Sequence, residues 1–274
     1  MPIVTVQDFT GVYAEQPFIQ GLRESAATDK NIHWFDCTQV DGTDCYCDDE
    51  AQAILLQQIE SVGNDSFGIH FFDNGNYHYM SKLWTDQVQE PFDLVVFDHH
   101  PDMQPPRFEG ILSCGGWIKE VLDHNKFVQN VIVIGVADHL VEEIREDLSQ
   151  ANSAEILNRV TFIRESELNS FGKDPSASPL WASLRMTLPC HISIDKDALS
   201  TAEAATNWDQ GSLTYDQLAE TLQILAQNRK ILGIDICGER ARDIGFEDTA
   251  TADALNNALN EKLFRLLTGL HGIQ

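Results

Sequence analysis

Short apolar runs alternate along the chain with stretches in which apolar residues recur every three or four positions. The short runs are typical of buried strands, and the longer stretches are typical of helices with one buried face. We predict strands at Ile32–Asp36, Phe67–Phe72, Leu94–Phe97, Asn130–Ile134, Val160–Ile163, His191–Ile194 and Ile231–Ile234. Strands that alternate with helices favour a parallel sheet covered by helices on both faces, so the predicted fold class is three-layer α/β/α.

The helical pattern recurs between these strands and after the last of them. We predict helices at Asp49–Val62, His78–Gln87, Trp117–His124, Asp138–Leu148, Pro179–Met186, Tyr215–Gln227 and Ala252–Leu270. Thr214 and Gln217 have the spacing of a capping box at the start of one of these helices. The predicted loops are Gly42–Asp48, Met103–Gly110, Ser170–Ser178 and Ser200–Ser212.

Composition limits the kinds of protein that this chain can be. Its 274 residues, 43% of them hydrophobic, predict a single domain spanning residues 1–274. No run approaches the roughly 20 apolar residues of a membrane span, and the N-terminus lacks a secretory signal pattern, so we expect a cytoplasmic protein without a membrane partner. A net charge of −25 argues against a nucleic-acid partner. It favours small cationic molecules as substrates, although an acidic surface also simply confers solubility.

Six cysteines are scattered along the chain without the paired spacing of a zinc finger. We predict that most are reduced and structural. Cys45 and Cys47 are the exception, because they lie in a polar, turn-like run. They could oxidise, bind metal or border an active site, and an ordinary loop is the alternative.

The densest polar cluster follows two of the predicted strands. Asp98, His100 and Asp102 come after one strand, and Asp195 and Asp197 come after another. Because alternate side chains of an extended segment point the same way, each set can converge on one side. Carboxylates brought together in this way repel each other unless a cation neutralises them. The sequence therefore predicts a divalent metal site at the ends of these strands.

A third predicted strand is followed by His78, which completes a set of four aspartates and two histidines. This set suits two adjacent divalent ions better than one structural zinc, which favours thiolates and four ligands in total. We predict manganese. Two such ions, about 3.5 Å apart, can hold a bridging water and present it as hydroxide to an electrophilic carbon, which is hydrolytic chemistry.

The three segments resemble motifs of the ureohydrolase (arginase/agmatinase) superfamily. They read Gly75-Asn76-Tyr77-His78, Asp98-His99-His100-Pro101-Asp102 and Ser193-Ile194-Asp195-Lys196-Asp197. In that superfamily a Gly-rich His motif, Asp-Ala-His-x-Asp and Ser-x-Asp-x-Asp follow in the same order, each at the end of a parallel strand. Two later segments, Gly211-Ser212-Leu213-Thr214 and Gly233-Ile234-Asp235-Ile236, are also similar to family motifs. The resemblance covers residues 65–270.

The resemblance implies an arginase-like fold, two Mn²⁺ ions per chain and a homo-oligomeric assembly. It implies one ion held by His78, Asp98, Asp102 and Asp195, and a second held by Asp98, His100, Asp195 and Asp197. Asp98 and Asp195 would bridge the two ions. Asp102 would in addition accept a hydrogen bond from the bridging hydroxide and orient it for attack.

The chain also departs from the family pattern. Ser113-Cys114-Gly115-Gly116-Trp117 stands where arginases and agmatinases place a His-Gly motif, so the family's proton-shuttling histidine is missing. Cys114 could lie near that position, with a role in packing as the favoured alternative. Where the family has a guanidinium-binding glutamate this chain has Gly238, and Glu239 follows it. We predict that Glu239 binds substrate, with a surface ion pair to a neighbouring arginine as the alternative. His99 replaces a small residue, and we expect it to face away from the metals.

These observations predict a binuclear manganese hydrolase that cleaves a carbon–nitrogen bond of a small guanidino or amide compound. One alternative is a single-zinc amide hydrolase resembling the deacetylases. Retention of His78 and Asp102 speaks against it, because those enzymes need only the ligands of the other ion. A second alternative is a metal-binding protein without catalytic turnover, which the missing histidine keeps open.

Overall fold

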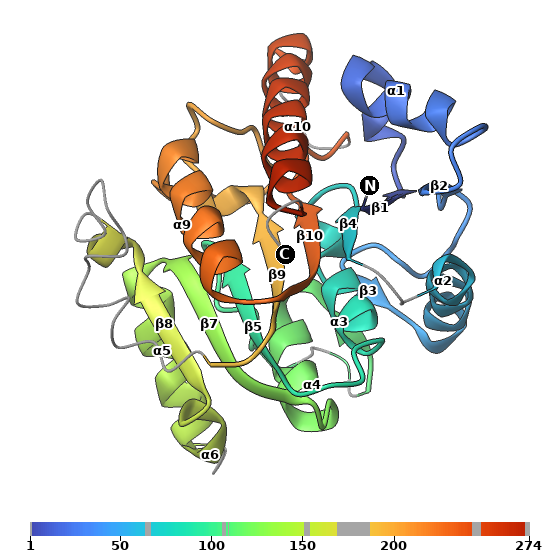
Figure 1. Ribbon diagram of the computed structural model, residues 1–274. Helices are drawn as coiled ribbons and strands as arrows, with labels where there is room; N and C mark the ends of the chain where they lie inside the picture. The colour runs from blue at the N-terminus through green and yellow to red at the C-terminus, as the bar shows by residue number, and fades with distance from the viewer. Residues whose placement is uncertain are drawn as a thin grey trace.

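The computed structural model describes residues 2–63, 67–105, 108, 110–150, 154–168, 187–242 and 248–271. An eight-stranded sheet with the strand order β2-β1-β4-β10-β9-β5-β7-β8 forms its centre (Figure 1), and every pair of neighbouring strands is parallel. The strands are β1 Ile3–Asp8, β2 Ile32–Asp36, β4 Gly68–Phe71, β5 Phe92–Phe97, β7 Val128–Val136, β8 Val160–Arg164, β9 Cys190–Asp195 and β10 Ile231–Cys237. The predicted α/β fold class is confirmed.

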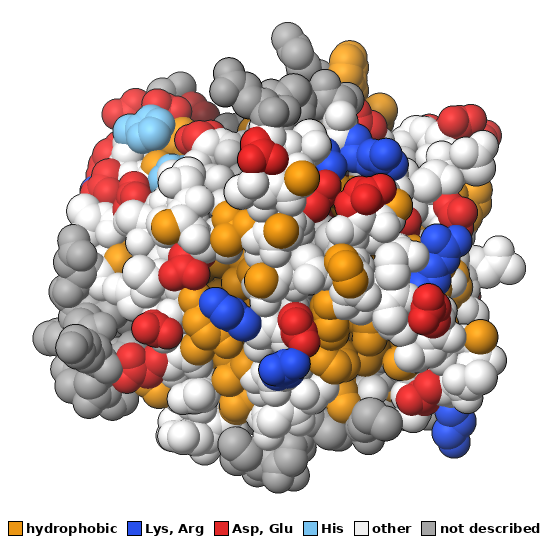
Figure 2. Space-filling view, turned by 90° about the horizontal axis from the view of Figure 1, so that it is seen from above, with side chains coloured by type: hydrophobic (Ala, Val, Ile, Leu, Met, Phe, Trp, Pro, Cys, Tyr) orange, Lys and Arg blue, Asp and Glu red, His pale blue; other side chains and the backbone are white. Residues whose placement is uncertain are grey.

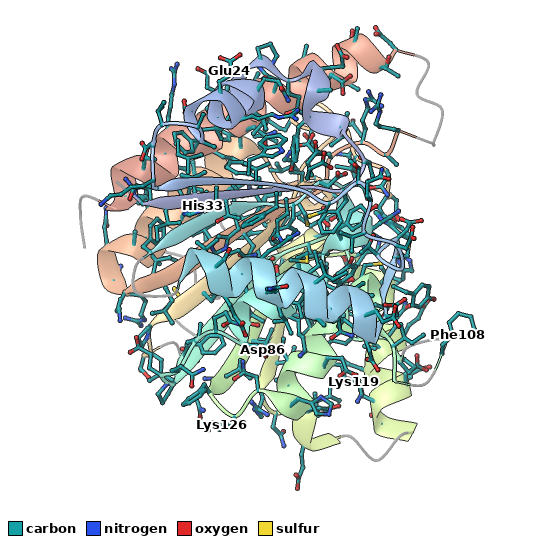
Figure 3. All side chains as sticks on the ribbon, turned by 90° about the vertical axis from the view of Figure 1, so that its right-hand side faces the viewer. Glu24, His33, Asp86, Phe108, Lys119 and Lys126 are labelled. Carbon is teal, nitrogen blue, oxygen red and sulfur yellow. The ribbon has the colours of Figure 1, made fainter. Side chains whose placement is uncertain are left out.

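Helices cover both faces of this sheet. They are α1 Pro17–Ser25, α2 Asp49–Val62, α3 Met80–Thr85, α4 Trp117–His124, α5 Asp138–Gln150, α6 Ala154–Leu157, α9 Tyr215–Asn228 and α10 Thr249–His271. Apolar residues of α1, α9 and α10 pack with one hydrophobic core, and those of α2 to α5 pack with a second core on the opposite face. Figure 3 shows the sheet edge-on between α1 and α10 on one side and α2 and α4 on the other.

Strand β9 presents an apolar face to one side of the sheet and a polar face to the other. Ile192 and Ile194 are fully buried in the α9 and α10 core, because alternate side chains point to opposite faces. His191, Ser193 and Asp195 point to the other face and are equally buried. This polar face of a central strand leads directly to the acidic cluster.

All seven predicted strands are present, with ends that differ by a few residues. The helices predicted at 49–62 and 117–124 have the observed bounds, and the capping box of Thr214 and Gln217 is present at α9. The helix predicted at His78–Gln87 is wrong at its start, because a 3-10 turn at Gly75–Tyr77 precedes His78 and α3 begins only at Met80. The helix predicted at 179–186 and the loop predicted at 170–178 lie outside the described residues.

The sequence pattern did not reveal β1 or α1. It also assigned residues 42–48 to a loop, where the structure contains β3 Tyr46–Cys47 paired antiparallel with β6 Leu112–Ser113. Within the part of the chain that the structure describes, no helix combines the length and apolar character needed to cross a membrane.

Candidate metal centre

The two acidic motifs follow the carboxyl ends of neighbouring strands, β5 and β9, in the middle of the sheet. In the strand register Phe97 of β5 lies beside Ile194 of β9, and Cys237 of β10 lies beside Asp195. Asp98, the residue after β5, therefore lies close to Asp195. Binding sites of open parallel sheets commonly lie at this edge, outside the carboxyl ends of the strands.

His78 faces three carboxylates at once. Its Nδ1 lies 3.0 Å from Asp102 Oδ2, 3.2 Å from Asp98 Oδ2 and 3.5 Å from Asp195 Oδ2. Its other ring nitrogen, Nε2, lies 2.8 Å from Ser193 Oγ. A hydrogen-bond partner at the second ring nitrogen fixes the orientation of the ring and leaves Nδ1 available to bind a metal ion, as around metal-bound histidines in general.

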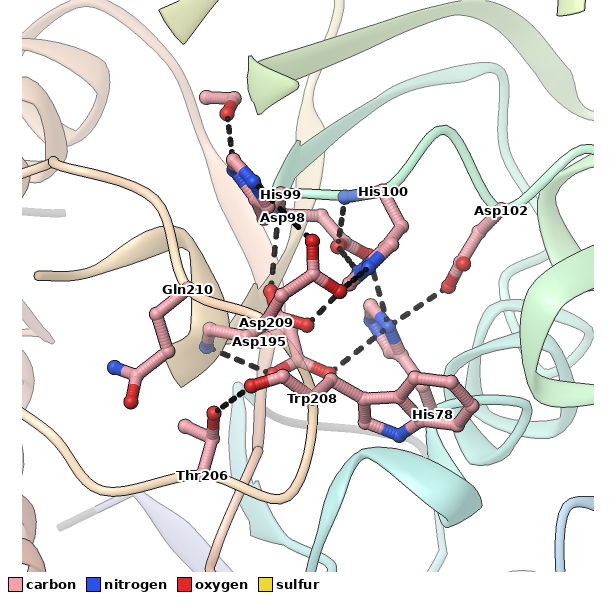
Figure 4. Close-up of polar contacts among 12 residues, drawn as sticks. His78, Asp98, His99, His100, Asp102, Asp195, Thr206, Trp208, Asp209 and Gln210 are labelled. Atoms are coloured by element: carbon pink, nitrogen blue, oxygen red, sulfur yellow. Dashed lines mark hydrogen bonds and ion pairs between the residues drawn. The ribbon is translucent and has the colours of Figure 1, made fainter. Parts of the chain in front are cut away.

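His100 forms a second group with Asp98 and Asp197. Its Nδ1 lies 3.0 Å from Asp197 Oδ2 and 3.5 Å from Asp98 Oδ1, while Nε2 lies 3.1 Å from Asp209 Oδ1 (Figure 4). The ligand atoms of each of the two groups, His78 with Asp98 and Asp102 and His100 with Asp98 and Asp197, lie close enough together to hold an ion. Asp98 belongs to both groups and is thus placed to bridge two ions.

The local backbone aims these side chains. Asp195 accepts a hydrogen bond from the backbone N–H of Asp197 at 3.0 Å, and the backbone N–H of His100 donates to Asp98 Oδ1 at 2.7 Å. Asp102 has a φ of 45°, in the left-handed region that only glycine adopts freely. Such strain clusters at functional sites, and the indole N–H of Trp117 holds the Asp102 carboxylate in place at 2.7 Å.

The electrostatics of the cluster favour a bound cation. Burial, together with the charges of Asp197 and Asp98, raises the pKa of Asp195 to about 7. Burial and Asp98 raise the pKa of Asp197 to about 6. In addition, Asp98 Oδ2 is buried and accepts no hydrogen bond in the structure, although His78 Nδ1 lies 3.2 Å away. Divalent ions would supply the missing charge and ligand contacts, so the donor set of aspartates and histidines fits the predicted metals.

A cavity of about 120 Å³ opens above the cluster. The predicted ligands Asp98, His100, Asp102, Asp195 and Asp197 contribute to its wall, and His78 lies beneath them, 1% exposed. The remaining lining residues are Gly75, Pro101, Gln104, Cys114, Gly115 and Trp208. Cys114 thus reaches the cavity. The predicted loops at Met103–Gly110 and Ser200–Ser212 contribute Gln104 and Trp208, which the sequence pattern did not single out.

The structure places Glu239 differently from the sequence prediction. Its side chain is fully buried, is absent from the cavity lining and forms an ion pair with the ammonium of Lys196. Gln16 and Asn260 also donate to its carboxylate, each at 2.8 Å. The alternative, a surface ion pair with an arginine, is wrong, because neighbouring Arg240 binds Asp253 instead. Contact between Glu239 and a substrate stays a prediction that this arrangement does not favour.

Two further residues, His99 and Cys237, lie beside the acidic cluster. His99 points away from the ligand groups, with Nδ1 3.3 Å from the carbonyl oxygen of Gly135. The Sγ of Cys237 lies 3.3 Å from Asp195 Oδ2, a contact that the sequence pattern did not indicate. Only the register of β10 beside β9 brings this thiol to the cluster.

The fold and the cluster together define a class of protein, a three-layer α/β protein with a histidine and aspartate metal site at the carboxyl edge of its sheet. Comparison with known proteins identifies the family within that class. The sequence model of the arginase family matches residues 75–261, a range that contains all six predicted ligands. The chain belongs to the arginase family. Its members are hydrolases that act on carbon–nitrogen bonds other than peptide bonds, and this chain is a hydrolase of that kind.

Solved structures show the same fold. Formimidoylglutamase from Bacillus subtilis aligns with a TM-score of 0.66 and 16% identity, covering 98% of this chain and 87% of its own. Agmatine ureohydrolase of Thermoplasma volcanium aligns with a TM-score of 0.65 and 15% identity, covering 99% and 90%. A formiminoglutamase of Trypanosoma cruzi with Mn²⁺ aligns with a TM-score of 0.61 and 10% identity, covering 94% and 92%.

A curated sequence relative is an uncharacterized protein of Thermotoga maritima. It is 28% identical over 238 residues, which cover 87% of this chain and 80% of the relative.

Proposed function

We propose that this protein is a binuclear manganese hydrolase that cleaves a carbon–nitrogen bond of a small guanidino or amide compound, working as a homo-oligomer. The observation that carries the proposal is the pair of ligand groups that share Asp98, one built on His78 and the other on His100. Asp195, 3.5 Å from His78, is the second bridging residue of the proposal. The manganese in the Trypanosoma cruzi structure supports the choice of metal by analogy only.

When bound, a pair of divalent ions supplies an activated water as nucleophile and polarises the carbon that it attacks. The remaining work falls to side chains of this chain. Asp102, fixed by Trp117, can accept a hydrogen bond from the attacking water and orient it. His78 and His100 are held in position by Ser193 and Asp209 through their second ring nitrogens. We assign Glu239 a supporting role, since it keeps Lys196 directed away from the cavity.

Metal content measured by elemental mass spectrometry tests this proposal. The protein is purified without a metal-affinity tag, loaded with manganese and freed of unbound ions. We expect close to two ions per wild-type chain, and a loss of both in Asp98→Ala, because this carboxylate belongs to both groups. Asp123→Ala, which removes an exposed carboxylate on α4, should keep both ions.

The same samples are then assayed for release of urea or ammonia from a panel of guanidino and amide compounds. Release by wild type and Asp123→Ala, but not by Asp98→Ala, would support the hydrolase. One zinc ion per chain with acetate release from acylated amines would favour the deacetylase alternative. Two ions without any release from the panel would favour a metal-binding protein without turnover.

A further inference from the structure

Two of the six cysteines differ from the others in their surroundings. Cys45 and Cys114 are half-buried, and Cys114 lines the cavity above the acidic cluster. The other four are at most 1% exposed, and they are Cys37, Cys47, Cys190 and Cys237. All six are reduced in the structure. Reagents in solution therefore reach Cys45 and Cys114 more easily than the other thiols of this chain.

The two half-buried thiols lie next to each other, although they are far apart in the sequence. Strand β3 pairs antiparallel with β6, and Tyr46 lies opposite Ser113 in this pair. One step further along the ladder Cys45 lies opposite Cys114, whose backbone N–H donates to the Cys45 carbonyl oxygen at 2.9 Å. A side-chain hydrogen bond with Cys45 also raises the pKa of Cys114. The two side chains are thus direct neighbours.

This pairing has the backbone spacing that a disulfide needs. Residues directly opposite each other on antiparallel strands have Cα atoms about 4.5 to 5.5 Å apart. Disulfides join residues whose Cα atoms are about 4.4 to 6.8 Å apart. Side chains of opposite residues also project from the same face of a strand pair. A bond between the sulfur atoms of Cys45 and Cys114 therefore requires no rearrangement of the two strands.

Both sides of the pair are fixed by contacts with residues near the site. Asp44, the residue before Cys45, accepts a hydrogen bond from the side-chain amide of Asn76 at 2.8 Å. On the other side, the carbonyl oxygen of Gly115 accepts one from the backbone N–H of Gln104 at 2.9 Å. Cys45 itself has a φ of 58°, a left-handed conformation that clusters at functional sites when the residue is not glycine. Because the two thiols are held side by side in advance, joining them needs little further ordering.

A metal ion does not explain the pair. Among the residues that the structure describes, neither thiol belongs to a group of three or more side chains whose ligand atoms lie close enough together to hold an ion. A structural zinc site would need four such ligands. Two neighbouring thiols without further ligands are instead the arrangement in which oxidation produces a disulfide.

We propose that Cys45 and Cys114 are a redox-active pair that closes reversibly to a disulfide, which makes one wall of the cavity sensitive to oxidation. A peroxide is the oxidant. The sulfur of one thiol attacks a peroxide oxygen and becomes a sulfenic acid as one water leaves, and the second thiol then forms the S–S bond as a second water leaves. The two sulfurs together lose two electrons and two protons, and the peroxide is reduced to water. Two small thiols reverse the step by exchange and leave as their own disulfide.

Labelling of the native full-length chain with N-ethylmaleimide, followed by mass spectrometry, tests the inference. We expect two labels on each reduced chain, at Cys45 and Cys114, because the other four thiols are buried. After treatment with hydrogen peroxide and removal of the excess, we expect neither label and a linked Cys45–Cys114 peptide in a digest made without reductant. Dithiothreitol should restore both labels.

Cys47 and two single variants provide the controls. Cys47 lies close to Cys45 in the sequence but is fully buried opposite Leu112, so it should stay unlabelled and unlinked in every sample. Cys45→Ser and Cys114→Ser should each keep one reactive thiol, which peroxide converts to a sulfenic acid that dimedone traps. Neither variant should form a linked peptide.

Wild-type protein that keeps both labels after peroxide, or in which peroxide oxidises the two cysteines separately without a linked peptide, would overturn the inference. A linked peptide that joins Cys47 to either thiol would also overturn it, because the pairing seen in the structure would then not be the one that reacts. The labels are read without a metal or substrate assay, so this inference stands or fails separately from the proposed function.

Discussion

Single residues at the site are constrained by how closely the backbone packs around them. Gly238 has a φ of 90°, and a Cβ atom there would lie 2.4 Å from Asp195 Oδ1 and 2.6 Å from the backbone nitrogen of Lys196. No side chain fits in that space, so a glutamate at this position is excluded by the structure. The sequence showed that Gly238 departs from the family pattern, and the packing around it shows that the departure is sterically required.

Gly238→Ala should therefore displace the Asp195 carboxylate and strain the backbone. We expect manganese binding to weaken by about tenfold or more, as for other changes that misplace a ligand, and the free energy of unfolding to fall by about 2 kcal/mol. Metal titration and urea denaturation measure the two effects. Gly269→Ala, where nothing lies within 4 Å of the added methyl group, is the matched control. Unchanged metal affinity in Gly238→Ala would mean that Asp195 does not need its observed position.

At the level of elements, three strands are joined by a buried histidine–aspartate–histidine cluster. Asp235 of β10 lies 2.7 Å from His70 Nδ1 of β4 and 2.9 Å from His191 Nε2 of β9. All three residues are at most 5% exposed, and the His70 ring stacks on Trp84 of α3. Although burial alone would raise the pKa of Asp235, contacts with His191 and His70 hold it below its ordinary value. The carboxylate thus stays ionised and holds the centre of the sheet together.

Asp235→Asn should destabilise the fold without removing a metal ligand. Breaking one side of a buried ionic cluster costs about 3 kcal/mol, so we expect the free energy of unfolding at neutral pH to fall by that amount. Urea denaturation measures it. The manganese content per folded chain should stay at the wild-type value. A parallel loss of metal would contradict the expectation that Asp235 stabilises the sheet without affecting the metal centre.

The same cluster gives a pH dependence with a definite sign. Burial lowers the pKa of His70, and Asp235 is also shifted downward. In both cases the unfolded chain binds more protons in acid, so stability falls as the pH falls. The contribution of His70 to the free energy of unfolding is present in full above its unfolded pKa of about 6.5 and is lost as the pH falls below that value. The contribution of Asp235 is lost as the pH falls below its unfolded pKa of about 3.9. Urea denaturation at a series of pH values from 7 to 3 tests this. The free energy of unfolding of the wild-type protein should fall in both pH ranges.

These elements also show what sequence reasoning can and cannot reach. The apolar run of β5 predicted a strand because both of its faces are buried, and the acids at the ends of β5 and β9 predicted the cluster. Strand β1 was missed because Thr5 and Gln7 are polar yet fully buried, and Gln7 satisfies its amide through Trp84 and Gln58. The pairing of Lys196 with Glu239, and the approach of Trp208 to the cavity, depend on segments distant in the sequence, which local patterns do not report.

For the molecule as a whole, negative charge dominates the surface. The net charge is −25, and Figure 2 shows a face on which acidic side chains are widely scattered and basic ones are few. Such a field attracts cations over a distance of about 10 Å at 0.1 M salt. The field and the acidic cavity act in the same direction, since both favour a positively charged substrate.

This field should make catalysis of cationic substrates sensitive to salt. We expect kcat/KM for a guanidinium compound to fall about threefold as NaCl rises from about 0.02 M to about 0.5 M, because screening weakens attraction to the protein. Steady-state kinetics with a neutral amide substrate, at the same salt concentrations, provides the control. Equal salt responses of the two substrates would show that surface charge has no part in substrate capture.

The contacts of Glu239 have a consequence for how the protein is made. Its carboxylate is bound by Gln16 and Asn260, which lie 244 positions apart and also bind each other. On a ribosome, the segment with Asp195, Lys196 and Asp197 emerges well before Asn260 does. Until then Lys196 has only part of the environment that keeps its charge turned away from the acids. We therefore expect the ligands to reach their final arrangement, and metal to load fully, only after α10 has left the ribosome and closed over the N-terminal segment.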